Sequence, residues 1–335
     1  MTKTVVARAP GKVNLFLQVG PLGADGYHPL VTVFQAVDLY EEVAATKLPV
    51  GSGIVITASG PGSDQVPLDN SNLAAKAALA LATRIGIAAD VSLHLEKGVP
   101  VAGGMAGGSA DAAAALLACN ELWQAGLPVE SLSEIAAELG SDVPFSLLGG
   151  TALGTGRGHL LTPIPTSLVL HWAFAIQDTG LSTPSVFRKF DEPRLGSEPR
   201  AWGDSASAPF RLAQNNGRVP FSFAQNDGGV PFEFAENHGG LSFGFAQSDS
   251  DIGKLLTNDL QVAALALRPE LAETIRAAEE AGALGVIVSG SGPTIAALAA
   301  SGNEAQSIAD NWLATGTASN AIVTTGPARG AHIVH

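Results

Sequence analysis

The chain has 335 residues, of which 46% are hydrophobic and 15% are charged, so it carries enough apolar side chains for the cores of two domains. Its formal net charge of −13 argues against nucleic acid or an anionic membrane as a partner, because the field of the protein repels both. The single cysteine, Cys119, cannot form an intramolecular disulfide, and residues 1–14 contain no apolar signal-peptide segment, so we expect a cytoplasmic protein.

The first predicted elements are two extended segments joined by a polar loop. Residues 12–19 alternate in character and predict a strand that projects Lys12 and Asn14 from one face. Lys12 is then either directed inward or an ordinary solvated lysine. The stretch of turn residues that follows presents the pair Tyr27 and His28 on a loop, ahead of a second extended segment.

A helix with clear end signals comes next. Ser71 or Asn72 can cap its start, and Gly86 provides its stop just after Arg84. The apolar side chains of residues 91–95 alternate, which predicts a strand after the helix.

The segment after that strand is rich in glycine and leads into a helix predicted from Ser109 to about Ala125. Exposed glycine backbone and the first amides of a helix both favour a bound phosphate. The Gly-Lys-Ser/Thr ending of a P-loop and the G-x-G-x-x-G pattern of a dinucleotide-binding loop are both absent. A turn that only allows tight helix packing is the alternative. Ser109 could cap the helix, contact phosphate or ligate Mg²⁺, and Asp111 could stabilise the helix dipole or face a metal ion. The residues assigned to ATP binding are Pro100, Val101, Ala102, Gly103, Gly104, Met105, Ala106, Gly107, Gly108, Ser109 and Ala110.

The rest of the chain mixes helices with strands, which predicts an α+β protein. A capping-box pattern at residues 131–134 starts a short helix that Gly140 closes. Asp142 follows in a short loop, where it either fixes a turn or takes part in chemistry. We expect a strand at 169–176 and helices from about residues 184, 258 and 270. The charge-free segment 281–303 is long enough to span a bilayer, but its Gly-Ser-Gly-Pro break predicts a strand, a turn and a helix instead.

One region is an eleven-residue repeat that starts at Pro209 and continues to about residue 252. Each unit has an apolar pair followed by a polar turn, so stacked hairpin-like turns are one interpretation. The interpretation we favour is a low-complexity segment inserted at about residues 192–250, because a few short units offer little core. We expect no part of it to take part in catalysis.

Three separated motifs resemble those of the GHMP kinases. They are residues 9–14 (APGKVN), 101–111 (VAGGMAGGSAD) and 289–293 (SGSGP). The resemblance implies a two-domain fold: a ribosomal protein S5 domain 2-like N-terminal domain at 1–160, with the ATP loop, and a ferredoxin-like C-terminal domain at 161–335. The repeat insertion then interrupts the second domain.

Three further stretches resemble the branch of that superfamily that phosphorylates 4-diphosphocytidyl-2-C-methyl-D-erythritol. They are residues 24–28 (ADGYH), 140–144 (GSDVP) and 258–260 (NDL). The resemblance implies ATP-dependent phosphorylation of the 2-hydroxyl of that alcohol, in the nonmevalonate route to isoprenoid precursors, with ATP and Mg²⁺ as cofactors. The implied partner is a small-molecule substrate, with no nucleic acid and no membrane. The alternatives are a GHMP kinase for mevalonate, homoserine or a sugar, and a noncatalytic nucleotide-binding protein.

The same resemblance implies roles for individual side chains. Asp142 would accept the proton of the hydroxyl, Lys12 would assist it, and Asn14 would lie near the substrate. A neighbouring lysine lowers the pKa of an aspartate, so Asp142 is either a base or a group that positions the hydroxyl. The side chains implied to hold the cytosine are Tyr27 and Phe187 on its two faces and His28 on its edge.

Overall fold

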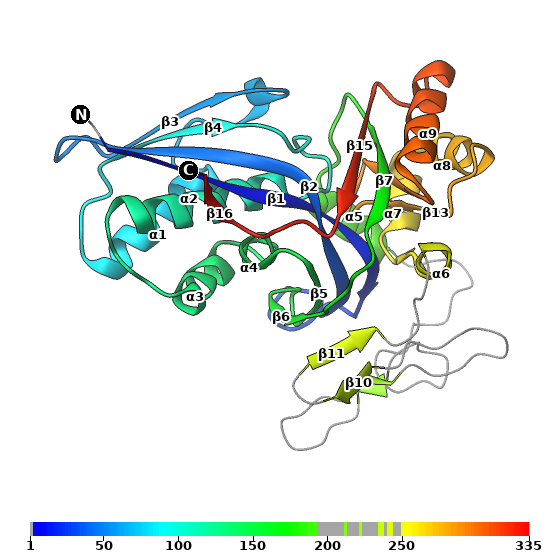
Figure 1. Ribbon diagram of the computed structural model, residues 1–335, viewed down its shortest axis with the longest axis horizontal. Helices are drawn as coiled ribbons and strands as arrows, with labels where there is room; N and C mark the ends of the chain where they lie inside the picture. The colour runs from blue at the N-terminus through cyan, green and yellow to red at the C-terminus, as the bar shows by residue number, and fades with distance from the viewer. Residues whose placement is uncertain are drawn as a thin grey trace.

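The computed structural model describes residues 3–192, 211–212, 221–222, 234–237, 240–243 and 249–334. Its two main β-sheets stand beside each other, each covered by its own helices (Figure 1). In that view, α1, α3 and α4 lie below the first sheet, and α8 and α9 flank the second sheet on its outer side. The arrangement is the mixed α and β, two-domain architecture that the sequence predicts.

The first sheet has eight strands in the order β12-β1-β2-β4-β3, with β16 paired to β1 and the hairpin β5-β6 paired to β2. Strands from late in the chain, β12 and β16, thus join the sheet of the N-terminal part. The division of the chain near residue 160 remains a prediction. The strands are β1 Thr4–Val19, β2 Leu30–Lys47, β3 Ile54–Ser59, β4 Val91–Glu96, β5 Thr151–Thr155, β6 Leu160–Pro163, β12 Thr257–Asn258 and β16 His332–Val334. The short helix η1 Ser63–Gln65 and the helices α1 Leu73–Ile85, α2 Gly107–Leu122, α3 Val129–Leu139 and α4 Val143–Leu148 belong to this part.

The second sheet has four antiparallel strands in the order β13-β14-β7-β15. With the helices between them, these strands follow the β-α-β-β-α-β pattern of a ferredoxin-like domain, as predicted. The strands are β7 Leu170–Ile176, β13 Gly285–Val288, β14 Ile295–Ala299 and β15 Asn320–Gly326. The helices are α5 Thr183–Asp191, α6 Asp249–Leu255, α7 Gln261–Leu267, α8 Leu271–Glu280 and α9 Gly302–Thr315.

The predictions for the repeat segment fall largely outside the described residues. Its described parts are four short strands that form two antiparallel pairs, β8 with β9 and β10 with β11. Their bounds are β8 Arg211–Leu212, β9 Phe221–Ser222, β10 Phe234–Asn237 and β11 Gly240–Phe243. Both interpretations of the repeats remain predictions.

Helix α1 follows its sequence signals. The side-chain oxygen of Asn72 accepts a hydrogen bond from the amide of Ala74 at 2.8 Å, so Asn72 is the cap. Gly86 ends the helix in the left-handed conformation, with φ of 72°. Helix α2 is apolar all round and largely buried, and its alanines allow close approach of α1 and the first sheet. Cys119 is buried in it, and burial raises the pKa of the thiol to about 12, which keeps it unreactive.

Three local predictions were wrong. Helix α2 begins at Gly107, so Ser109 lies inside its first turn and caps nothing. Helix α3 begins at Val129 after Pro128, which places the proposed capping box of residues 131–134 inside the helix. Residues 295–299 form strand β14 rather than a helix. A short, fully buried apolar run has no periodicity that separates strand from helix, and pairing with β13 and β7 decides the outcome.

A shared core joins the two sheets. Val13 and Val33 of the first sheet are buried in the same cluster as Trp172 and Phe174 of the second. The indole N–H of Trp172 also donates to the side-chain oxygen of Gln35 at 2.9 Å, which fixes β7 against β2. This interface brings the motifs of the two parts together at one cleft.

Candidate active site

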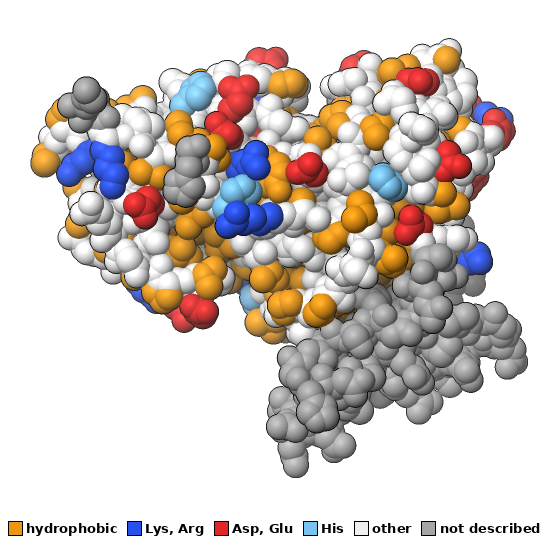
Figure 2. Space-filling view, viewed as in Figure 1, with side chains coloured by type: hydrophobic (Ala, Val, Ile, Leu, Met, Phe, Trp, Pro, Cys, Tyr) orange, Lys and Arg blue, Asp and Glu red, His pale blue; other side chains and the backbone are white. Residues whose placement is uncertain are grey.

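A cleft of about 970 Å³ lies between the two parts of the molecule. All three motifs line it, together with the Tyr27-His28 loop and the start of α5. Acidic side chains are scattered over the face of the molecule in Figure 2 and do not gather in one patch there. A large cleft with several polar side chains in its lining is the candidate active site.

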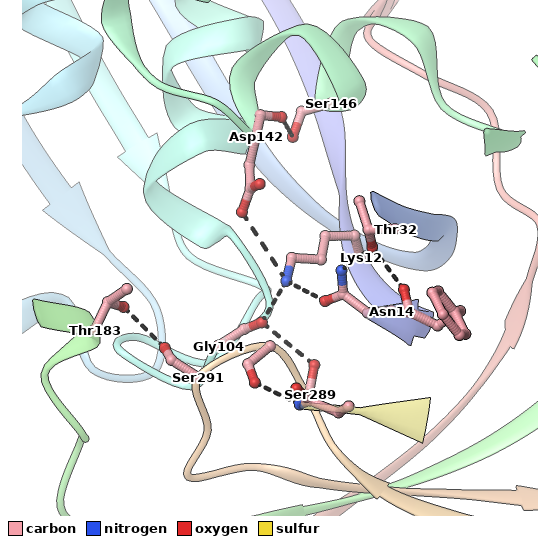
Figure 3. Close-up of polar contacts among 12 residues, drawn as sticks. Lys12, Asn14, Thr32, Gly104, Asp142, Ser146, Thr183, Ser289 and Ser291 are labelled. Carbon is pink, nitrogen blue, oxygen red and sulfur yellow. Dashed lines mark hydrogen bonds and ion pairs between the residues drawn. The ribbon is translucent and has the colours of Figure 1, made fainter. Parts of the chain in front are cut away.

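Lys12 is buried in the cleft wall and its ammonium is directed into the site (Figure 3). It donates to the side-chain oxygen of Asn14 at 2.7 Å and to the carbonyl oxygen of Gly104 at 2.9 Å. The register of β1 shifts on both sides of this segment, between Pro10 and Gly11 and again after Asn14, and such bulges turn side chains away from their regular directions. Of the two interpretations of Lys12, the inward one is confirmed.

The ammonium of Lys12 also faces a carboxylate. Its Nζ lies 4.0 Å from Oδ2 of Asp142. Burial lowers the pKa of Lys12, and the charge of Asp142 partly opposes that effect. Asp142 precedes α4 at its N-cap position, yet its side chain makes no capping hydrogen bond. The carboxylate is about one third exposed, so it is available to a molecule in the cleft.

A chain of hydrogen bonds fixes the amide of Asn14. Its nitrogen donates to the hydroxyl of Thr32 at 2.8 Å, and that hydroxyl donates to the carbonyl of Phe16 at 2.7 Å. Because the nitrogen of Asn14 is used in this way, its side-chain oxygen is the atom that faces Lys12. The hydrogen-bond partners therefore define which way the amide is oriented.

The glycine-rich loop packs directly against the motif at residues 289–293. A Cβ on Gly104 would lie 2.1 Å from the carbonyl oxygen of Ser289, and one on Gly290 would lie 2.8 Å from Nζ of Lys12. Both glycines have positive φ, so two reasons exclude larger residues there. Asn258 holds the second loop from behind, since its amide nitrogen donates to the carbonyls of Val288 and Gly290.

The predicted ATP loop combines open backbone with a helix start. Its residues from Gly103 to Ser109 line the cleft apart from Met105, which is fully buried below it. Ser109 lines the cleft within the first turn of α2, so its hydroxyl is available to phosphate or metal. The prediction that Asp111 serves the helix dipole or a metal was wrong, because it is buried and paired with Lys97 at 2.5 Å.

Aromatic and charged side chains form the far end of the cleft. Tyr27 is 54% exposed, and the guanidinium of Arg157 lies 4.8 Å from its ring centre. His28 is buried and stacks on Phe187 with ring centres 5.1 Å apart. Its Nδ1 lies 2.8 Å from the carbonyl oxygen of Gly20, which fixes the ring. The structure thus brings the three predicted cytosine-binding side chains to one place.

Sequence reasoning missed several residues of this lining. The hydroxyls of Thr183, at the start of α5, and Ser291, between β13 and β14, lie 2.8 Å apart within the second part of the molecule. Asp191 lies 3.3 Å from Nε2 of His28, and Arg157 lies over Tyr27. Only Ser291 lies inside a quoted motif; the other three belong to segments without a local signal, so only the fold reveals them.

Known proteins that are similar to this chain belong to one superfamily of kinases. The family model described as the N-terminal domain of GHMP kinases matches residues 72–150, and the one described as GHMP kinases C terminal matches residues 245–318. A 4-diphosphocytidyl-2-C-methyl-D-erythritol kinase of Thermobifida fusca is 46% identical over 99% of this chain and 98% of its own. One of Streptomyces coelicolor is 47% identical over 99% of both chains. The chain belongs to the 4-diphosphocytidyl-2-C-methyl-D-erythritol kinase family of the GHMP kinases.

Solved structures show the same architecture for this kinase. A crystal structure of 4-(cytidine 5'-diphospho)-2C-methyl-D-erythritol kinase is 27% identical, with a TM-score of 0.63 over 97% of this chain and 98% of that chain. A homoserine kinase from Cytophaga hutchinsonii, 21% identical, has a TM-score of 0.68 over 100% of this chain and 98% of its own, and shows the fold alone. Within the part of the chain that the structure describes, no helix is long and apolar enough to cross a membrane, including the segment 281–303.

Proposed function

We propose that this kinase transfers the γ-phosphoryl group of ATP to the 2-hydroxyl of 4-diphosphocytidyl-2-C-methyl-D-erythritol. The oxygen of the hydroxyl forms a bond to the γ-phosphorus, the bond to the β,γ-bridging oxygen breaks, and ADP leaves. The observation that carries the proposal is the Lys12–Asp142 pair, in a cleft that the glycine-rich loop and the Tyr27-His28 loop also line. The names and near-complete coverage of the relatives support the choice of alcohol.

The two charged side chains have separate tasks in this mechanism. Asp142 accepts the proton of the attacking hydroxyl or holds that hydroxyl in line with the phosphorus. Lys12 is fixed by Asn14 and Gly104, so its ammonium is already in place to stabilise the carboxylate and the transferring phosphoryl group. A preorganised cation in a buried site does not have to be reoriented during the reaction.

Backbone amides of the glycine-rich loop and the start of α2 hold the β- and γ-phosphates in this proposal. Mg²⁺ neutralises phosphate charge when bound, and it normally keeps several waters and phosphate oxygens as ligands. The residues present suit that weak mode of binding. The described residues contain no group of three or more His, Cys, Asp or Glu side chains placed to hold a metal, and Ser109 offers one hydroxyl in the cleft.

The far end of the cleft receives the cytidine diphosphate part of the alcohol. Tyr27 and Phe187 offer faces for the base, and His28 reaches the edge of the base through Nε2, the ring nitrogen that faces Asp191. Arg157 and Arg188 also line the cleft, and their guanidinium groups suit the two phosphates. Because the chain has a net charge of −13, an anionic substrate can bind only where cations are placed locally, as these two arginines are.

Two wider expectations complete the proposal. The predicted division into residues 1–160 and 161–335 places the ATP loop in the first part and Phe187 in the second. We place the reaction in the cytoplasm, because the chain has a single cysteine, buried and without a disulfide, which suits a reducing compartment.

A panel of alcohols tests the function. Purified protein with ATP and Mg²⁺ is assayed for ADP release with the diphosphocytidyl alcohol, mevalonate and homoserine, each at equal concentration. We expect turnover only with the first, at least about 100-fold above the others. Asp142→Asn should lose that turnover, whereas Asp310→Asn, on the exposed side of α9, serves as the matched control. Equal turnover of mevalonate or homoserine would refute the choice of substrate. The absence of ADP release with every alcohol would refute the proposed kinase activity.

A further inference from the structure

Three charged side chains form a buried cluster behind the glycine-rich loop. Lys97 follows β4, Glu41 belongs to β2 and Asp111 to α2, and each is at most 4% exposed. The ammonium of Lys97 lies 2.7 Å from Oε1 of Glu41 and 2.5 Å from Oδ2 of Asp111. None of the three lines the cleft, and none has a task in the proposed phosphoryl transfer.

The cluster connects both ends of the loop. At the entrance, the amide of Gly98 donates to Oε2 of Glu41 at 3.0 Å, next to Lys97. At the exit, a Cβ on Gly107 would lie 2.7 Å from Oε1 of the same carboxylate, so Glu41 lies directly against the start of α2. Asp111 extends the cluster one turn further along that helix. One carboxylate of β2 thus contacts the residues that open and close the loop.

The loop between these ends has an unfavourable backbone conformation. Ala102 has φ of 53° and Ala106 has φ of 62°, and the left-handed region costs about 1 kcal/mol or more for each residue with a side chain. Such a conformation persists only where its surroundings determine it. The contacts at both ends of the loop and the packing of Gly104 on Ser289 hold the loop in this conformation.

Stability alone is a poor reason for this cluster. Burying two carboxyl groups with one ammonium carries a large desolvation penalty, and apolar side chains of similar size often stabilise a protein as well or better. In addition, Oδ1 of Asp111 has no hydrogen-bond partner among the described residues. The cluster therefore specifies a conformation at the expense of stability.

We propose that Glu41, with Lys97 and Asp111, is a positioning residue that holds the glycine-rich loop in its phosphate-binding conformation before the nucleotide arrives. This inference rests on the proposed binding of ATP by that loop. Loss of the Glu41 carboxylate lets the loop sample other conformations, so part of the binding energy is used to order it. The affinity for nucleotide falls, while the far end of the cleft, where the alcohol binds, is unaffected.

The test compares three variants by two measurements that need no turnover. These are the Kd for ADP, by titration calorimetry, and hydrogen exchange of the amides of residues 98–107 in the unliganded protein. Glu41→Ala should weaken ADP binding about tenfold and speed exchange in the loop. Glu41→Gln should restore the Kd to within about 1.5-fold of the wild type, because its amide oxygen can still accept from Gly98. Asp90→Ala is the matched control, since Asp90 also accepts backbone amides, those of Gly51 and Gly53, in a turn that does not line the cleft.

The outcomes separate this inference from the proposed function. If the wild-type protein does not bind ADP, the proposed function fails and the inference fails with it. If the wild type and a folded Glu41→Ala variant bind ADP equally and exchange at equal rates, the inference alone is overturned. Where Glu41→Ala does not fold, Asp111→Asn keeps the shape of the side chain and weakens its pairing with Lys97. It should raise the Kd about threefold, and an unchanged Kd with unchanged loop exchange would overturn the inference.

Discussion

A methyl group at Gly290 tests whether the position of the Lys12 ammonium controls turnover. The added Cβ would lie 2.8 Å from Nζ of Lys12 and 2.9 Å from the carbonyl oxygen of Gly104, with the backbone at φ of 56°. Ordinary contacts between such atoms begin near 3.5 Å, so the ammonium must move by roughly half an ångström or more. A displacement of that order at a reacting centre costs up to about 100-fold in rate. Gly290→Ala should therefore lower kcat by about 10- to 100-fold.

The backbone penalty of the same substitution can be measured separately. Gly316 ends α9 with φ of 68° and open space around its Cβ position, so Gly316→Ala carries the left-handed penalty of about 1 kcal/mol without touching the site. Gly290→Ala should lose at least as much thermal stability as Gly316→Ala, because it adds a steric cost to the same backbone penalty, and only Gly290→Ala should lose kcat. Steady-state kinetics and thermal unfolding of both proteins check this. A folded Gly290→Ala enzyme with wild-type kcat, or an equal loss of kcat in Gly316→Ala, would refute the reasoning.

Further predictions follow from the charged and aromatic groups. Asp142→Asn should lower kcat by about 100-fold or more with an unchanged unfolding temperature, and a kcat within twofold of wild type would remove Asp142 from the mechanism. Burial lowers the pKa of Lys12, so kcat should decline on the alkaline side below the free-lysine value of 10.5, as a pH–rate profile would show. Burial and the charge of Asp111 raise the pKa of Glu41 from 4.5 to about 8, so the folded state keeps a proton that the unfolded chain releases. The free energy of unfolding should then fall as pH rises from about 4.5 to about 8, by at most about 1.4 kcal/mol per pH unit. Burial also raises the pKa of Asp111, so urea denaturation between pH 5 and pH 8 should show a steeper fall in the wild type than in Glu41→Gln, and parallel curves would contradict the prediction. Tyr27→Ala should raise the KM for the alcohol about tenfold and leave the KM for ATP unchanged, whereas an equal rise in both would indicate a general loss of structure.

Local signals in the sequence were sufficient to predict elements whose ends are marked by capping residues. Asn72 and Gly86 delimit α1 because a cap and a left-handed glycine act within a few residues of the helix ends. The alternation in β1 correctly placed Lys12 and Asn14 on one side. The same logic failed for the start of α2 and for β14, where residues distant in sequence decide the conformation.

The sequence by itself determined which segments to expect at the site, and all of them line the cleft: the motif around Lys12, the glycine-rich loop, the loop at Asp142 and the serine-glycine motif of residues 289–293. Only the tertiary structure decided how they combine. It placed Lys12 between Asp142 and Gly104, and it buried Asp111 outside the cleft, paired with Lys97. The physical reason is that Coulombic and packing interactions act over a few ångströms in space, whatever the separation along the chain. A pattern in the sequence can identify the residues that take part, but only the folded backbone sets the distances between them.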